Sequence, residues 1–289
     1  MTIIKATNDK SLPPNCKLFV VGEPQMLLIQ PSARHEEKNN GVQREVDLIA
    51  ERSAKGFAIV FFDCTEWARA LMPWADDAVS RDDEVGRHAP DTLRFVEHCL
   101  LPRLRQRFGA LPCIIGGYSL GGLFALWAAR NSNAFSAIAA ASPSLWIRGW
   151  GEYAASHPIL IPTSDKKAYD ELQMIRQAGS LPSQCDKKRY DELQMISQAG
   201  SLPSQCNKSQ AHNELRHSIV HLSLGDREEL CRNQRMQRIG DCVRAEYALL
   251  CTQLSSANVT LKWHPGGHFG AEAERTAEAF AWCIEQIRC

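Results

Sequence analysis

The sequence lacks the features that would point to nucleic acid or membrane binding. Lysine plus arginine and aspartate plus glutamate both number 33, and no long basic stripe occurs, so neither nucleic acid nor an anionic membrane is expected as a partner. No stretch reaches the ~18 apolar residues that span a bilayer. Residues 1–14 are polar and show no secretory signal, so we expect a cytoplasmic location.

The sequence also lacks any C-x-x-C pair. Its 11 cysteines are scattered, and an odd number cannot all pair within one chain. We therefore expect reduced, mostly buried thiols, as in a cytosolic protein. No metal and no cofactor is predicted, and the pattern does not address the oligomeric state.

What the sequence does contain is typical of a globular α/β protein. Its 289 residues are 44% hydrophobic and 23% charged, which favours one domain of ordinary size or a domain with an insertion. Short apolar runs alternate with helical patterns, which predicts a mostly parallel sheet with helices on both faces. The predicted strands include residues 17–21, 26–30, 57–62, 135–141, 218–224 and 259–263.

A tandem duplication interrupts this alternation. Residues 165–185 read DKKAYDELQMIRQAGSLPSQC, and residues 186–206 repeat them with two differences. Two copies fall short of the roughly three that a solenoid needs. We expect one α/β domain formed by residues 1–164 and 207–289, with residues 165–206 as an insertion. The insertion is either a surface appendage, because loops tolerate additions, or a lid over the site.

The sequence Gly117-Tyr118-Ser119-Leu120-Gly121 matches the G-x-S-x-G nucleophile elbow. In this motif a strained strand-to-helix turn exposes the serine hydroxyl, and the flanking glycines leave room where strand and helix cross. A buried-type strand precedes the motif and an apolar helix follows it, as the motif requires. Ser119 is therefore the candidate nucleophile.

A serine nucleophile needs a histidine base that is held by a carboxylate. In α/β-hydrolases these groups follow in the order serine, acid, histidine. His268, after the last predicted strand and a Gly-Gly turn, is the candidate base, with His264 as its rival. Glu228 is the favoured acid after the strand ending at residue 224, and Asp226 in the same loop is the alternative.

Two further groups of residues belong to the predicted site. The backbone N–H of Leu120 and one from Ser32 or Ala33 are expected to form the oxyanion hole, because Pro31 has no N–H. Aromatic side chains at the same edge of the sheet either line a substrate pocket or cover the rim of the core. These are Tyr118, Trp67 and Trp146, with Trp74 and Trp150 nearby.

Four segments resemble the putative esterase family of α/β-hydrolases, which includes esterase D, enterochelin esterases, feruloyl esterases and mycolyltransferases. They are the elbow at residues 116–122, Ser-Pro-Ser-Leu-Trp at 142–146, Gly-Asp-Arg-Glu-Glu at 225–229 and Gly-Gly-His-Phe at 266–269. The resemblance runs from about residue 26 to the last residue and excludes the duplicated segment. It implies a triad of Ser119, Glu228 and His268, although the loop offers Asp226 as well.

The expected function is a serine carboxylesterase that hydrolyses small-molecule esters through an acyl-enzyme. Acyl transfer and thioester cleavage on the same triad are alternatives within enzyme chemistry. The alternative outside it is a non-catalytic binding protein that kept the α/β-hydrolase fold and uses the duplicated segment as an interaction surface.

Overall fold

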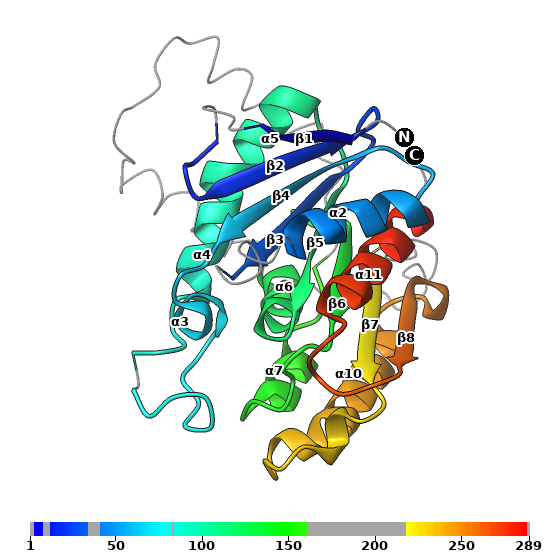
Figure 1. Ribbon diagram of the computed structural model, residues 1–289. Helices are drawn as coiled ribbons and strands as arrows, with labels where there is room; N and C mark the ends of the chain where they lie inside the picture. The colour runs from blue at the N-terminus through cyan, green and yellow to red at the C-terminus, as the bar shows by residue number, and fades with distance from the viewer. Residues whose placement is uncertain (1–2, 8–11, 34–40, 83, 161–217, 288–289) are drawn as a thin grey trace, which may run out of the picture. The chain divides into compact units, whose positions relative to one another are not determined.

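The computed structural model describes residues 3–7, 12–33, 41–82, 84–160 and 218–287 (Figure 1). The chain divides into two units, Met1–Thr163 with Arg216–Cys289, and Ser164–Leu215. The duplicated residues 165–206 belong to the second unit and lie outside the described residues. The predicted insertion and its boundaries therefore stay predictions. All described strands and helices belong to the first unit.

The described residues of this unit form an eight-stranded sheet with the order β1-β2-β4-β3-β5-β6-β7-β8. The first two strands pair antiparallel at one edge, and the others are parallel to one another, which confirms the predicted mostly parallel sheet. The first strand was not predicted, because the sequence around it is polar. The strands are β1 (Ile3–Thr7), β2 (Cys16–Val21), β3 (Leu27–Ser32), β4 (Phe57–Asp63), β5 (Cys113–Tyr118), β6 (Ala137–Ala141), β7 (Ile219–Gly225) and β8 (Val259–His264).

Helices cover both faces of the sheet, as predicted. Figure 1 shows α2 (Gly41–Arg52) and α11 (Glu272–Gln286) side by side on one face. Strand β4 shows how both faces become core: Phe57, Ile59 and Phe61 pack toward α2 and α11, whereas the alternate residues pack on the opposite face. The opposite face is covered by α3 (Trp67–Leu71), α4 (Ala89–Phe95), α5 (Leu101–Phe108), α6 (Leu120–Asn131), α7 (Trp150–Ser156) and α10 (Ile239–Gln253).

The helical segment from Ala89 to Phe108 is interrupted before Pro102. A π-helical turn, η1 (Val96–Leu100), separates α4 from α5, and the N–H of Leu101 bonds the carbonyl of Val96. The wider turn accommodates Pro102, which has no N–H to continue the α-helical pattern. No helix among the described residues is long and apolar enough to cross a membrane.

Strands β3, β5, β6, β7 and β8 lie next to one another and run parallel. Their carboxyl ends therefore share one edge of the sheet, where ligand sites of open α/β sheets form. The elbow follows β5, the acidic loop follows β7 and the loop with His268 follows β8. The topology brings the three predicted catalytic segments to the same edge.

Candidate active site

The turn between β5 and α6 has the geometry of a nucleophile elbow. Ser119 is forced to a φ of 56°, in the left-handed region that side chains other than glycine rarely adopt. The turn is tight enough that a Cβ added at Gly117 would lie 2.9 Å from the carbonyl carbon of Gly121. The two glycines therefore allow the strand and the helix to cross, and the hydroxyl of Ser119 stands at the sheet edge.

His268 lies between the serine hydroxyl and a carboxylate. Its Nε2 is 3.1 Å from Oγ of Ser119, and its Nδ1 is 2.7 Å from Oε2 of Glu228. The His268 side chain is 19% exposed, whereas that of Glu228 is 3% exposed. The structure thus brings three residues that are 149 and 40 positions apart into one hydrogen-bonded line.

Glu228 is held from two sides. Its Oε1 accepts hydrogen bonds from the N–H of Gly225 at 2.7 Å, from the hydroxyl of Ser142 at 2.8 Å and from Nη1 of Arg275 at 2.8 Å. Burial by itself raises the pKa of this carboxyl, but the hydrogen bonds from His268, Gly225 and Ser142 outweigh it and hold the pKa below its usual value. Glu228 is therefore an ionised acceptor for His268 at neutral pH.

The loops after β7 and β8 are bonded to each other along their length. The backbone N–H groups of Asp226 and Arg227 bond the carbonyls of His264 and Gly266, respectively. The carboxylate of Asp226 accepts from the N–H of Gly266 at 2.8 Å. Asp226, the alternative acid, therefore fastens the two loops, and it is Glu228 that reaches His268.

His264, the rival base, ends strand β8 and faces a helix. Its Nδ1 lies 3.9 Å from Oε2 of Glu278 in α11, and burial lowers its pKa. The side chain belongs to the packing between β8 and α11, whereas His268 is the histidine that reaches the serine.

The two predicted oxyanion-hole positions lie at the start of α6 and the end of β3. Leu120 is the first residue of α6, so its N–H has no partner within the helix. Ser32 is the last residue of β3, is fully buried, and its carbonyl accepts from the N–H of Cys64 at 3.0 Å. The two segments touch, because a Cβ added at Gly121 would lie 3.3 Å from the ring of Pro31.

A largely apolar cavity of about 260 Å³ opens beside His268. Trp146, one of the predicted pocket residues, lines it. Leu230 and Phe269 also line it and are 76% and 84% exposed, so apolar side chains stand at its mouth. Met236 and Ile239 line it as well. This cavity therefore provides an apolar space next to the hydrogen-bonded side chains of His268 and Glu228.

The other predicted pocket residues do not line this cavity. The Tyr118 hydroxyl donates to the carbonyl of His268 at 2.6 Å, so this side chain helps to fix the backbone of the segment that carries His268. The indole of Trp67 packs 3.5 Å from the position of a Cβ on Gly121, against the beginning of α6. Trp74 and Trp150 stack on each other with ring centroids 6.4 Å apart; Trp150 is buried in the core, and the partly buried Trp74 packs against it.

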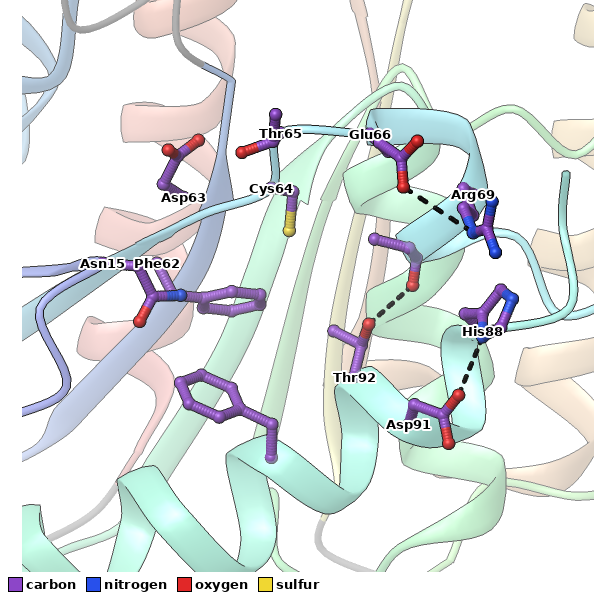
Figure 2. A pocket seen from close by; sticks show the side chains of 12 residues that line it. Asn15, Phe62, Asp63, Cys64, Thr65, Glu66, Arg69, His88, Asp91 and Thr92 are labelled. Carbon is purple, nitrogen blue, oxygen red and sulfur yellow. Dashed lines mark hydrogen bonds and ion pairs between the residues drawn. The ribbon is translucent and has the colours of Figure 1, made fainter.

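A larger cavity of about 400 Å³ lies at the carboxyl end of β4. Figure 2 shows two pairs among the side chains that line it, Glu66 with Arg69 and His88 with Asp91. The hydroxyl of Thr92, which also lines the cavity, is bonded to the carbonyl of Ala70 at 2.7 Å. Neither Ser119 nor His268 lines this cavity. The size of this cavity therefore does not make it the candidate active site.

Sequence reasoning missed three residues around the site. Ser142, at a φ of 44°, donates to Glu228, and the hydroxyl of Ser144 lies 3.1 Å from that of Ser119. Both stand in the segment 142–146 that carries part of the family resemblance, but the sequence alone assigns them no role. Arg275 was missed altogether, because an arginine in the first turn of a helix is usually a surface residue.

Comparison with known proteins places the chain in a family. A family model described as putative esterase matches residues 14–230. The matched range contains Ser119 and Glu228 and ends before β8, so that His268 lies outside it. A search of curated proteins found no match.

Three solved structures share the fold at low sequence identity. An IroE-like serine hydrolase from Shewanella oneidensis is 14% identical, with 98% of this chain and 80% of that chain covered and a TM-score of 0.56. The siderophore hydrolase EstB from Aspergillus nidulans is 15% identical, with 97% and 92% covered and a TM-score of 0.55. EstA from the same fungus is 16% identical, with 98% and 94% covered and a TM-score of 0.52.

At these identities the solved structures bear on the fold alone, and they agree with the α/β-hydrolase architecture predicted for the chain. The family model carries more, because it matches well over half of the sequence. The chain belongs to the putative esterase family and is an ester hydrolase with the α/β-hydrolase fold.

Proposed function

We propose that the protein is a serine carboxylesterase that hydrolyses small-molecule esters through an acyl-enzyme. Ser119 is the nucleophile, His268 the general base and Glu228 the acid that orients it. The observation that carries this proposal is the hydrogen-bonded line from Oγ of Ser119 through the imidazole of His268 to Glu228, on a turn strained at the serine.

In the first half of the reaction, His268 takes the proton of Ser119 at Nε2 while Oγ attacks the carbonyl carbon of the ester. The carbonyl oxygen becomes an oxyanion. The N–H of Leu120 at the positive end of α6 is suited to stabilise it. Ala33 is the proposed second donor, because the ladder between β3 and β4 uses the N–H of Ser32. As the intermediate collapses, His268 returns the proton to the leaving alcohol, and an acyl group stays on Ser119.

In the second half, water takes the place of the alcohol. His268 removes a proton from the water, the hydroxide attacks the acyl carbon, and Ser119 recovers its proton as the acid leaves. Glu228 stays ionised throughout and bonds Nδ1 of His268, which leaves Nε2 free to accept from the serine. The low pKa of the Glu228 carboxyl supports this role.

The cavity beside His268 supports an apolar group on one side of the ester. Trp146, Met236 and Ile239 line it, and Leu230 and Phe269 at its mouth extend the apolar surface. A space of about 260 Å³ suits a short acyl chain or a single aromatic ring better than a large polar substrate. Burial of each CH₂ group contributes about 0.8 kcal/mol of binding free energy.

The test is hydrolysis of p-nitrophenyl acetate and butyrate by the wild type and by Ser119→Ala. Loss of the nucleophile should reduce kcat by at least about 10³-fold, because the remaining groups then act without a nucleophile. Ser156→Ala is a matched control, since this serine is exposed at the end of α7. A fluorophosphonate should label the wild type at Ser119 and fail to label the variant. Equal hydrolysis by wild type and Ser119→Ala would contradict the proposal.

A further inference from the structure

The guanidinium group of Arg275 lies between the carboxylate of Glu228 and the loop that carries His268. The residue is 1% exposed, and it stands in the first turn of α11. Its position has two costs, because a cation near a helix amino terminus opposes the helix dipole and because a buried charge loses its water. The contacts of both terminal nitrogens compensate for these costs.

One terminal nitrogen fixes the acid. Nη1 of Arg275 donates to Oε1 of Glu228 at 2.8 Å and to the hydroxyl of Ser142 at 3.2 Å. With the N–H of Gly225 and the Ser142 hydroxyl also donating to it, Oε1 is fully occupied. Oε2 is then the oxygen that accepts from Nδ1 of His268. The orientation of the carboxylate is thus determined from the side opposite the histidine.

The other terminal nitrogen fixes the segment that carries the base. Nη2 donates to the carbonyls of Pro265 at 3.2 Å and Gly267 at 2.9 Å, directly before His268. Nη1 also donates to the Tyr118 hydroxyl at 3.1 Å, which in turn donates to the carbonyl of His268. Three carbonyls of the histidine loop are therefore tied to one guanidinium group, directly or through one hydroxyl.

The packing around this group leaves no spare room. A Cβ added at Gly225 would lie 2.4 Å from the carbonyl oxygen of Gly266 and 2.8 Å from Nη2 of Arg275. The acid loop, the histidine loop and the guanidinium group hence meet at a position where only glycine fits.

We infer that Arg275 is a positioning residue for the ester hydrolysis proposed above, which holds Glu228 and the His268 loop in register and balances the charge of the buried acid. The inference rests on the proposed function. Planar, doubly donating geometry suits this task, because one rigid group reaches a carboxylate on one side and two carbonyls on the other. Arg275 itself does not touch the reacting atoms.

A charge-balancing role has a consequence for the pH dependence of catalysis. The charged or titratable groups around Glu228 are His268 and His264 from the β8 segment, Arg275 from α11 and Tyr118 from β5. Without the guanidinium charge, the buried carboxylate of Glu228 takes up a proton at higher pH. A protonated Glu228 no longer accepts from Nδ1 of the base, so the acidic limb of the kcat/KM profile should move to higher pH.

The experiment compares Arg275→Met and Arg275→Lys with the wild type. We expect Arg275→Met to lower kcat about 100-fold through misplaced catalytic groups, with KM changed little. Its acidic limb should rise by about 1 pH unit or more. Arg275→Lys, which keeps the charge but not the planar fork, should return the acidic limb toward the wild-type pH and recover part of kcat.

Arg130→Met is the matched control. Arg130 is also buried, pairs with the buried Glu246 and donates to the carbonyl of Ala154 at 3.1 Å, but it lies away from the site on α6. Its loss should lower stability and leave the shape of the pH profile unchanged.

The outcomes separate this inference from the proposed function. If both Arg275 variants keep the wild-type pH profile and lose activity only as far as Arg130→Met does, Arg275 is merely structural and the inference is wrong. If Arg275→Met does not fold, Arg275→Lys decides alone: a wild-type kcat and pH profile would overturn the inference. Ser119→Ala reports on the triad independently, because its full activity would refute the proposed function whatever the Arg275 variants do.

Discussion

Ser144 is a hydrogen-bond neighbour of the proposed nucleophile, in addition to His268. Its hydroxyl is 3.1 Å from that of Ser119, and its backbone N–H donates to the Ser119 carbonyl at 3.1 Å. When the Ser119 proton points to His268, the Ser144 hydroxyl has to donate to Ser119. The hydrogen bond from Ser144 therefore favours the side-chain rotamer that places Oγ of Ser119 next to His268.

We predict that Ser144→Ala lowers kcat roughly fivefold, which is the effect of one neutral hydrogen bond of about 1 kcal/mol. The backbone contact stays in the variant, so KM and folding should change little. Steady-state kinetics and the rate of fluorophosphonate labelling measure the effect. A loss as large as that of Ser119→Ala would contradict a role limited to orientation.

At the scale of single residues, the sequence predicts the candidate catalytic residues that belong to a recognisable motif. Ser119 follows from glycine spacing, and His268 follows from its place after the last strand. The sequence favours Glu228 but leaves Asp226 open as the acid, because the choice depends on which carboxylate points away from the Gly266 N–H. Arg275 and Ser144 have no local pattern, since their contacts are made by segments that are distant in sequence.

Strand β7 carries a buried histidine into the layer between the sheet and α11. The side chain of His221 is 1% exposed and its ring lies 5.6 Å from that of Trp282. Burial, together with the nearby His264 and Lys262, lowers its pKa from 6.5 to about 3. The folded protein thus keeps this imidazole neutral at pH values at which the unfolded chain protonates it.

This difference makes the packing of β7 against α11 sensitive to acid. Because the folded pKa lies below the unfolded one, the unfolded state binds more protons, and the stabilisation is complete above pH 6.5 and declines as the pH falls toward 3. From pH 7.5 to 5.5 the contribution of His221 to the free energy of unfolding should fall by about 1.4 kcal/mol.

We predict that His221→Phe loses this part of the pH dependence. Urea unfolding of wild type and variant at pH 7.5 and 5.5 measures it, and the difference between the proteins at pH 7.5 separates packing from titration. His264, whose pKa is lowered by burial, contributes equally to both proteins. An identical drop in both proteins between the two pH values would show that His221 has the same pKa in the folded and the unfolded protein, which would contradict the prediction.

The elements themselves could be predicted wherever apolar periodicity is strong. The buried parallel strands and helices α2, α6, α10 and α11 follow from it. The short helix α3 (Trp67–Leu71) could not, because five residues carry too little periodicity and its packing against the elbow decides its form. The antiparallel strand β1 likewise depends on pairing with β2, which no local pattern predicts.

For the molecule as a whole, the described residues on either side of 161–217 lie next to each other. The hydroxyl of Ser218, at the start of β7, donates to the carbonyl of Leu160 at 3.2 Å, and the N–H of Leu160 bonds the carbonyl of Ala129 in α6. The two described ends, Leu160 after α7 and Ser218 before β7, therefore lie side by side. The intervening segment therefore does not need to bridge a distance.

This geometry supports the expectation that residues 165–206 are an appendage to the α/β domain. We predict that deleting them leaves the domain folded, because the residues that stay, 161–164 and 207–217, suffice to connect adjacent ends. The connection becomes roughly four times shorter, which should raise the free energy of unfolding by about 1 kcal/mol through loop-closure entropy. Urea unfolding measures this change.

Hydrolysis of p-nitrophenyl acetate and butyrate by the deletion variant should keep the wild-type ratio of kcat/KM values, because Ser119, Glu228 and His268 are held by contacts among described residues. A changed ratio with unchanged stability would instead favour the alternative role of the segment as a lid.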